Sequence, residues 1–136
     1  MIMEDRLIRV GITHGDINGV GYEVILKTFS DVRVSELCTP IIYGSSKIAA
    51  YHRKLLEMPS INVNVISKAE EAGLNRVNII NCVDDDTKVE ISKSTAVAGE
   101  AAFKALDAAV TDLKRGVVDV LLTAPINKHN IQNETF

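Results

Sequence analysis

The sequence predicts an α/β protein of three layers, in which helices cover both faces of a mostly parallel sheet. Three observations support this fold class. Short apolar segments of strand length alternate along the chain with longer segments of helical periodicity, the pattern of parallel strands joined by helices. Glycine or proline marks many of the points where one kind of segment gives way to the next. The length of 136 residues suits one domain and suffices to bury a core.

The first predicted strand runs into a glycine-rich turn. Ile8, Val10 and Ile12 are β-branched and alternate along the chain ahead of Gly15, as in a strand that enters a sheet. From Gly21 onward apolar residues recur at helical spacing, which predicts a helix to about residue 29. The turn therefore lies at a helix N-terminus, where unpaired N–H groups and the helix dipole favour an anion.

Two interpretations of this turn stay open. The spacing Gly15-x-x-x-Gly19-x-Gly21 is neither the dinucleotide fingerprint nor a Walker loop, so it assigns neither NAD nor ATP. One interpretation is a site for a phosphate-bearing ligand. The other is a structural turn in which the glycines adopt positive φ and Asp16 or Asn18 caps the helix. Asp16 is the one carboxylate at the turn, and general-base work is the alternative to a capping role.

The middle of the chain predicts three more strands. Residues 40–44 form an apolar segment between proline and glycine, and the serines at 45 and 46 can cap a helix that runs to about residue 57. Met58 and Pro59 end this helix, and the connection that follows residue 29 is polar. Residues 62–67 and 76–81 alternate apolar with polar side chains, which predicts strands with an exposed face or an edge position. A single helical turn is expected within residues 68–74.

The longest predicted helix extends from about residue 95 to 115, with Gly116 as its stop. Its apolar stripe is expected to consist of Gly99, Ala102, Phe103, Leu106, Ala109, Val110 and Leu113. Many further alanines make the helix surface small, which predicts tight packing against a neighbouring element or, alternatively, a subunit contact.

Residues 117–123 are nearly all apolar and predict a central strand covered on both faces. The turn that follows, residues 124–128, lies at the carboxyl end of this strand, as the glycine turn does for the first strand. Open parallel sheets bind ligands beyond these ends. Thr123 and Lys128 are therefore candidate ligand contacts, and a solvated side chain is the alternative for Lys128.

Composition argues against several classes of function. The net charge of −3 provides no basic surface for nucleic acid. No apolar segment approaches the roughly 20 residues of a membrane helix, and the N-terminus lacks the pattern of a signal peptide, so we expect a cytoplasmic protein without membrane contact. Cys38 and Cys82 lack metal-ligand spacing and are expected to be reduced structural thiols.

The histidines and carboxylates do not predict a metal site. His14, His52 and His129 lie far apart in the sequence, and none belongs to a pair with metal-ligand spacing. His14 and His129 follow predicted strands and can approach a site, whereas His52 is expected mid-helix as a packing or surface residue. The run Asp84–Asp86 lacks the spacing of a calcium loop and predicts a solvated acidic loop. No constellation of nucleophile and base is present, so no catalytic residue is assigned.

Three segments nevertheless resemble a known family. Residues 12–23 (ITHGDINGVGYE) are similar to the motif Ile-Thr-x-Gly-Asp-Pro-Ala-Gly-Ile-Gly-Pro-Glu that opens the 4-hydroxythreonine-4-phosphate dehydrogenases of pyridoxal phosphate biosynthesis. Residues 122–128 (LTAPINK) resemble that family's Thr-x-Pro-x-x-Lys turn, and residues 94–102 (STAVAGEAA) resemble the start of its long helix. The three segments occur in the family's order, and the resemblance covers essentially the whole chain.

The resemblance implies the fold and activity of that family. The fold is the two-domain α/β/α architecture shared with isocitrate and isopropylmalate dehydrogenases, and the enzymes work as homodimers. They oxidise the secondary alcohol of a phosphorylated substrate with NAD or NADP at a divalent metal, and the β-keto acid product then loses CO₂. In such a reaction the metal polarises the alcohol while hydride leaves to the nicotinamide.

The chain also departs from the family pattern. Ile17, Asn18 and Tyr22 replace the motif's proline, alanine and second proline, which puts the shape of the turn in question. Family members are much longer, and the resemblance places their His-Thr pair and metal-binding histidines beyond the position of Phe136. Residues 1–136 are therefore expected to form either a single α/β domain or the N-terminal part of a longer two-domain dehydrogenase, truncated and inactive alone.

The resemblance leaves the substrate open between related compounds. An enzyme for D-threonate or D-erythronate 4-phosphate is the alternative within the same class. A non-catalytic module for anion binding or dimerisation is the alternative from a different class. The candidate residues near substrate or cofactor are the same in each case: Gly15, Asp16, Gly19, Gly21, Thr123 and Lys128.

Overall fold

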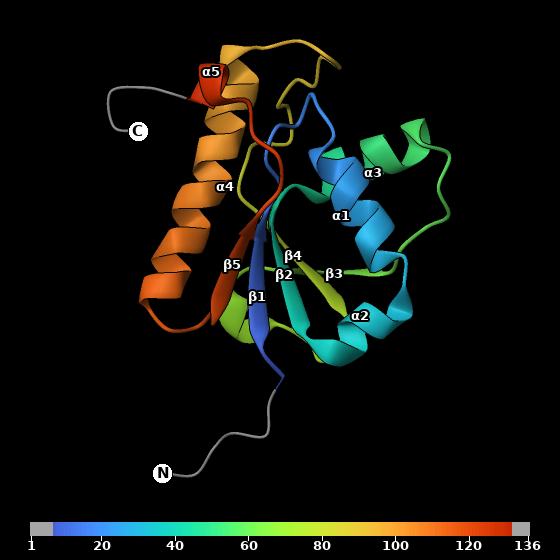
Figure 1. Cartoon of the computed structure of the whole chain (residues 1–136), viewed down its shortest axis with the longest axis vertical. Helices are drawn as coiled ribbons and strands as arrows, with labels where there is room; N and C mark the ends of the chain where they lie inside the picture. The colour runs from blue at the N-terminus through green and yellow to red at the C-terminus, as the bar shows by residue number, and fades with distance from the viewer. Residues whose placement is uncertain (1–6, 132–136) are drawn as a thin grey trace.

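The computed structural model describes residues 7–131, which form a five-stranded sheet flanked by helices (Figure 1). The strand order is β3-β4-β2-β1-β5, and all four pairings are parallel. The predicted α/β class and parallel sheet are thereby confirmed. The strands are β1 (Arg9–Thr13), β2 (Thr39–Gly44), β3 (Val63–Ile66), β4 (Val77–Asn81) and β5 (Val120–Thr123). The helices are α1 (Gly21–Phe29), α2 (Val32–Leu37), α3 (Ser46–Leu55), the short η1 (Ala69–Glu71), α4 (Ala96–Lys114) and α5 (Lys128–Ile131).

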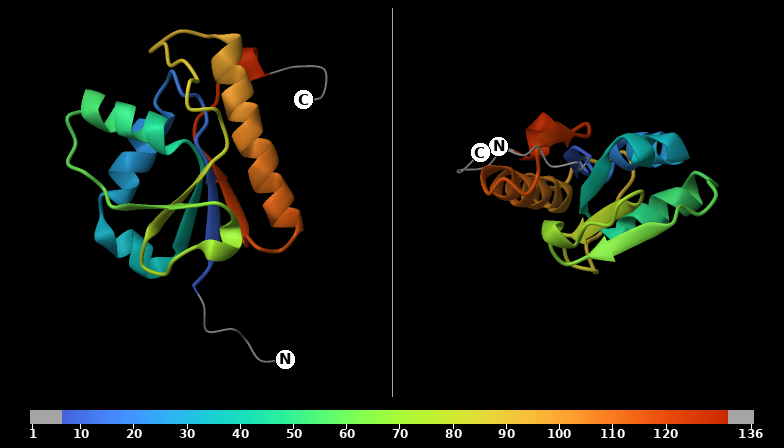
Figure 2. Two further views of the ribbon diagram at one scale, coloured as in Figure 1. Left: turned by 180° about the vertical axis from the view of Figure 1, so that it is seen from behind. Right: turned by 90° about the horizontal axis from the view of Figure 1, so that it is seen from below.

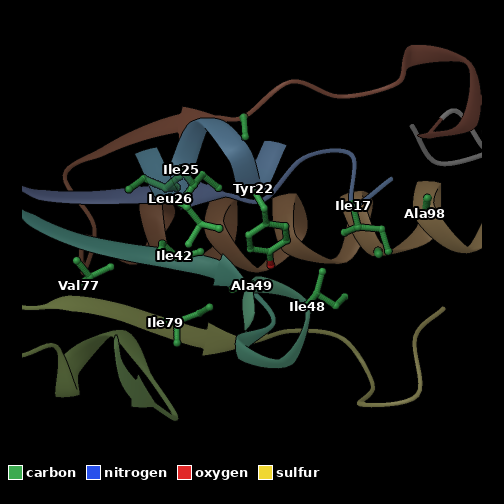
Figure 3. Close-up of a cluster of buried hydrophobic side chains, with 13 residues drawn as sticks. Ile17, Tyr22, Ile25, Leu26, Ile42, Ile48, Ala49, Val77, Ile79 and Ala98 are labelled. Atoms are coloured by element: carbon green, nitrogen blue, oxygen red, sulfur yellow. The ribbon is translucent and has the colours of Figure 1, made fainter. Parts of the chain in front are cut away.

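The helices form two layers, with α4 on one side of the sheet and α1 and α3 on the other (Figures 1 and 2). The central strand β2 is buried along its whole length. Ile42 packs with residues of α1 and α3, whereas Ile41 and Tyr43 pack with the α4 side. Successive side chains of a strand point to opposite faces, so β2 contributes to both layers of the core. Figure 3 shows Ile42 in the larger cluster, together with Ile79 of β4 and Tyr22 of α1.

Side-chain caps begin α3 and α4, and the first of them, at Ser45, confirms a prediction. The Ser45 side chain accepts a hydrogen bond from the Ile48 N–H at 3.1 Å and begins α3. The Thr95 side chain accepts one from the Ala98 N–H at 3.1 Å and begins α4. Such caps satisfy N–H groups that have no partner inside the helix. The edge position expected for one of the alternating strands is occupied by β3.

Helix α2 was not predicted from the sequence. It occupies the segment interpreted as a polar connection after α1, and none of its residues is buried. Its one sequence signal is Asp31, which caps it by accepting the N–H of Arg33 at 3.0 Å. A helix of six residues that buries no side chain has no apolar periodicity to reveal it.

The prediction that residues 117–123 form a central strand covered on both faces is wrong for the described part of the chain. Strand β5 lies at the edge of the sheet, beside β1. Leu121 packs against the α4 side, but Val120 is 45% and Leu122 59% exposed. Both faces of β5 carry apolar side chains that are suited to burial, but residues 7–131 cover only one of these faces.

The apolar stripe predicted for α4 is partly wrong. The buried residues of this helix are all alanines and one glycine: Ala98, Gly99, Ala101, Ala102, Ala105 and Ala109. The larger Phe103, Leu106 and Val110 are only partly buried. A Cβ at Gly99 would meet the carbonyl oxygen of Asn130 in α5. Small side chains thus let α4 approach its neighbours closely, so hydrophobicity alone misplaced the buried face.

Within residues 7–131, no helix combines the length and the apolar character needed to cross a lipid bilayer. Cys38 and Cys82 are both free thiols and partly buried. Burial raises the pKa of each, to about 11 for Cys82, so neither is a reactive thiolate at neutral pH.

Candidate functional site

The turns that follow β1 and β5 contact each other directly. The Asp16 N–H donates to the carbonyl oxygen of Pro125 at 2.8 Å, and the Ala124 N–H donates to that of Thr13 at 3.1 Å. Gly15 has a φ of +67°, and a Cβ there would meet the carbonyl oxygen of Pro125. Only glycine combines this backbone conformation with so close an approach. The structure therefore brings the two predicted turns together at the carboxyl ends of neighbouring strands.

The carboxylate of Asp16 stabilises the glycine turn itself. Its Oδ1 accepts the Asn18 N–H at 3.0 Å, and its carbonyl oxygen accepts the Gly19 N–H at 3.1 Å. The N-cap position of α1 is Val20, and no side chain caps it. The expectation that Asp16 or Asn18 caps the helix is thus wrong. The uncapped helix N-terminus keeps the anion-binding potential that was inferred from the sequence.

Asn18 fastens the turn to the segment that precedes α4. Its Nδ2 donates to the Lys93 carbonyl oxygen at 2.9 Å and to the Thr95 hydroxyl at 3.2 Å. Its Oδ1 accepts the Glu90 N–H at 2.7 Å. Asn18 is 1% exposed, so these bonds form away from competing water. The side chain joins two segments that lie more than 70 residues apart in the sequence.

Tyr22 lies at the centre of a buried polar network beneath the turn. Its hydroxyl lies 2.8 Å from Nδ1 of His14 and accepts the Ser45 N–H at 2.9 Å. Nε2 of His14 lies 2.9 Å from the carbonyl oxygen of Ala101, which can only accept. We therefore assign the proton of His14 to Nε2, so that the Tyr22 hydroxyl donates to Nδ1. The network links β1, α1, α4 and the start of α3.

Burial determines the charge of this network. It lowers the pKa of His14 to about 4 and raises that of Tyr22 far above its ordinary value. Burial also lowers the pKa of His52, whose ring stacks on Tyr22 with centroids 5.4 Å apart. Its Nε2 donates to the Ile17 carbonyl oxygen at 2.7 Å. Both histidines are neutral packing residues at pH 7, and a packing role was one of the two expected for His52. Neither is available as a base or metal ligand.

The three residues that depart from the family motif are all buried in this region. Ile17 and Tyr22 are 0% exposed and Asn18 is 1% exposed. Gly44 gives room to Tyr22, since a Cβ there would meet the Tyr22 hydroxyl and the His14 ring. The departures thus form a connected set of contacts that holds the turn in place. Sequence reasoning missed these roles because most of the side-chain partners, such as Lys93 and Glu90 for Asn18 and Ser45 for Tyr22, are distant in the sequence.

The second turn presents Thr123 and Lys128 at the surface. Both side chains are exposed, and Lys128 is the first residue of α5. Asn127 Oδ1 accepts the N–H groups of His129 at 2.9 Å and Asn130 at 3.3 Å, which fixes the start of this short helix. Lys128 forms no ion pair within residues 7–131. Its ammonium group is therefore free to contact an anion.

A cavity of about 230 Å³ opens between α1 and β5 beside the two turns. Its lining includes Thr123 and Pro125 but no charged residue, and it does not reach Gly19 or Lys128. Exposed apolar side chains border it, among them Val24 and Leu122. This cavity suits an apolar group, and its lining offers no charge to a phosphate.

No three His, Cys, Asp or Glu side chains gather as metal ligands in the part of the chain that the structure describes. Asp84 to Asp86 are exposed, as the solvated-loop interpretation predicts. The candidate site therefore offers backbone N–H groups, one carboxylate and one lysine. The N–H groups and the lysine can bind an anion, whereas the carboxylate would repel it.

Comparison with known proteins shows strong similarity over nearly the whole chain. A model of the family described as "Pyridoxal phosphate biosynthetic protein PdxA" matches residues 36–136. The chain is 59% identical over 134 residues to a 4-hydroxythreonine-4-phosphate dehydrogenase of Bacteroides thetaiotaomicron, covering 98% of this chain and 36% of that protein. It is 34% identical to a D-threonate 4-phosphate dehydrogenase of Cupriavidus necator, covering 93% of this chain and 38% of the relative.

A solved structure has the same fold. The crystal structure of a 4-hydroxythreonine-4-phosphate dehydrogenase from Burkholderia phymatum matches with a TM-score of 0.82 at 29% identity, over 93% of this chain and 39% of that one. The chain thus spans a little over a third of the length of the relatives it matches.

Proposed function

The chain belongs to the family of the pyridoxal phosphate biosynthetic protein PdxA, and from this premise we propose that it serves in a 4-hydroxythreonine-4-phosphate dehydrogenase. The proposed reaction oxidises 4-phosphohydroxy-L-threonine with NAD or NADP at a divalent metal. Its product is a 2-amino-3-oxo acid that decarboxylates. The observation that carries the proposal is the 59% identity to a named dehydrogenase over 98% of the chain.

The role proposed for this chain is to supply part of the wall of a substrate or cofactor site. Gly15, Asp16, Gly19 and Gly21 shape the turn at the N-terminus of α1, and Lys128 lies at the adjoining turn. Helix N–H donors and a lysine ammonium both stabilise a bound phosphate group. Thr123 is exposed and lines the apolar cavity beside the turns. The reaction's proton and hydride transfers are assigned to no residue here.

The described residues do not fit a divalent metal, because no set of ligand side chains converges and His14 and His52 are held in buried hydrogen bonds. They also form no open cradle for a dinucleotide, since a Cβ on Gly15 or Gly21 would meet the chain's own backbone. The metal ligands and the nicotinamide contacts are therefore proposed to come from residues beyond Phe136.

Three further properties belong to the same proposal. We expect a homodimer, for which the partly buried Leu106 and Val110 on α4 provide an apolar surface. We expect the cytoplasm as location, which agrees with the free thiols of Cys38 and Cys82. The expected substrate class is a phosphorylated small molecule.

A chimera tests the proposal. In it, this chain replaces the matching segment of the Bacteroides thetaiotaomicron relative, so that the remaining length of that protein follows Phe136. We expect the folded chimera to oxidise 4-phosphohydroxy-L-threonine in preference to D-threonate 4-phosphate, and the chain alone to show no turnover. Preference for D-threonate 4-phosphate would favour the alternative enzyme suggested by the 34% identical relative.

The non-catalytic alternative makes a different prediction. An independent anion-binding module should bind phosphate esters tightly as the isolated chain, whereas a site completed by other residues should bind them weakly. Titration calorimetry with both the chain and the chimera separates the two. Equal and tight binding by both would support the module and argue against the dehydrogenase.

A further inference from the structure

We propose that a groove along α3 binds a small anionic amphiphile, of the medium-chain carboxylate type, at a place separate from the two turns. The groove has a volume of about 510 Å³ and lies between α3 and residues 60–63. This volume is within the usual range of small-molecule sites. Leu26, Ala49, Ile61 and Val63 line its apolar part.

The apolar part of the groove continues into the main core. The same four residues also border the core cluster between α1, α3 and the sheet, where a gap of only about 10 Å³ remains. Ile61 and Val63 are partly exposed at the groove. A hydrocarbon chain laid there would remove apolar surface of both partners from water, which is favourable.

Arg53 supplies the charge complementarity for an anion. It lines the groove, and among the described residues its guanidinium donates one hydrogen bond, to the carbonyl oxygen of Met58 at 3.1 Å. It forms no ion pair with any residue from 7 to 131. Since a guanidinium has five N–H donors, most remain for a carboxylate. The bond to Met58 also fixes the group at the rim, so less entropy is lost on binding.

Further polar groups lie at the same rim. Ser60 and Asn62 line the groove, are exposed, and make no side-chain hydrogen bond within the described residues. Ser46 lines the opposite end of the groove, seven residues before Arg53 on α3, which is about 10 Å along a helix. The groove thus combines a guanidinium and polar donors with apolar side chains over roughly that length, and a carboxylate with a hydrocarbon tail matches both.

Titration of the protein with octanoate, followed by NMR chemical shifts, tests this inference. We expect saturable binding, with shifts confined to α3 and residues 60–63. Arg53→Gln should weaken octanoate binding by about tenfold or more, because a charge-assisted hydrogen bond is lost, while Arg53→Lys should retain part of the affinity. Lys54→Gln is the charge-matched control on the same helix turn. Lys54 is exposed and does not line the groove, so the affinity of this variant for octanoate should change less than twofold.

A second variant tests the groove itself. Ala50 is exposed and lines the groove, so Ala50→Leu should fill it and abolish octanoate binding while the circular dichroism spectrum stays unchanged. Neutral 1-octanol should bind more weakly than octanoate, and acetate should not saturate. The inference is overturned if octanoate fails to saturate, if Arg53→Gln and Lys54→Gln bind it equally, or if Ala50→Leu in its folded form binds it as well as the original protein.

Discussion

Replacing Tyr22 by phenylalanine should destabilise the protein strongly although it removes a single oxygen atom. The phenyl ring keeps the stacking on His52 and the edge contact with His14, whose centroids lie 5.4 and 5.5 Å from that of Tyr22. What is lost is the acceptor of the Ser45 N–H and the donor to His14 Nδ1. Both groups are then left buried without a partner.

The magnitude follows from those two groups. An unsatisfied buried donor or acceptor costs about 1–3 kcal/mol, so the loss of both predicts a decrease of about 2–6 kcal/mol in the free energy of unfolding. Domains of this size have about 5–15 kcal/mol in total, and a loss of this order lowers Tm by roughly 10 °C. Urea unfolding monitored by circular dichroism measures the difference directly.

Tyr51→Phe is the matched control. Tyr51 also contacts the His52 ring edge-on, at 5.7 Å, but it lies on the exposed face of α3 and its hydroxyl makes no hydrogen bond within residues 7–131. Its variant should lose less than about 0.5 kcal/mol. If Tyr22→Phe and Tyr51→Phe were equally stable, the hydroxyl network would not hold the turn, and the roles given to Tyr22 and His14 would be wrong.

Three other predictions concern pH, the turn and the exposed edge. The pKa of His14 is about 4 in the folded protein and 6.5 when unperturbed, so between these pH values the unfolded state binds a proton that the folded state does not. The free energy of unfolding should therefore fall by up to about 3 kcal/mol as pH drops from 6.5 to 4. His14→Gln should flatten this part of a plot of urea midpoint against pH, and an unchanged slope would refute the assignment. Gly15→Ala should cost more than about 2 kcal/mol, against about 1 kcal/mol for Gly116→Ala, because both have positive φ but only Gly15 faces a neighbouring backbone; equal losses in thermal unfolding would argue against the contact. Leu122→Lys should reduce self-association in light scattering, since Leu122 is 59% exposed beside an apolar cavity; a monomer at high concentration before the substitution would contradict the expected association.

Local signals were sufficient to predict most of the fold. Strand β2, helix α1 and the cap at Ser45 depend on nearby residues, and each was confirmed. The placement of both turns at carboxyl ends followed from the parallel sheet alone. Helix α2 was not predicted because it buries no side chain. The burial of β5 was predicted wrongly because the sequence of a strand does not show which elements pack on its two faces.

The supports of the candidate site were beyond sequence reasoning. Nothing local to Asn18 indicates that Glu90 and Lys93 will bind it, and the partners of His14 include a carbonyl 87 residues away. Likewise the buried face of α4 depends on how closely the neighbouring elements approach it. The alanines are therefore buried and Phe103 is only partly buried. Which residues contact a ligand stays a prediction. The residues that hold the turn in place, such as Asn18 and Tyr22, are identified by their hydrogen bonds.

The most direct test of the central claim is the KM of the chimera for 4-phosphohydroxy-L-threonine when Lys128 is replaced by glutamine. If the turns after β1 and β5 help to hold the phosphate, KM should rise about tenfold or more, since a charge-assisted contact is lost, while Tm stays the same because Lys128 is exposed and unpaired among the described residues. An unchanged KM in a folded, active chimera would contradict the claim.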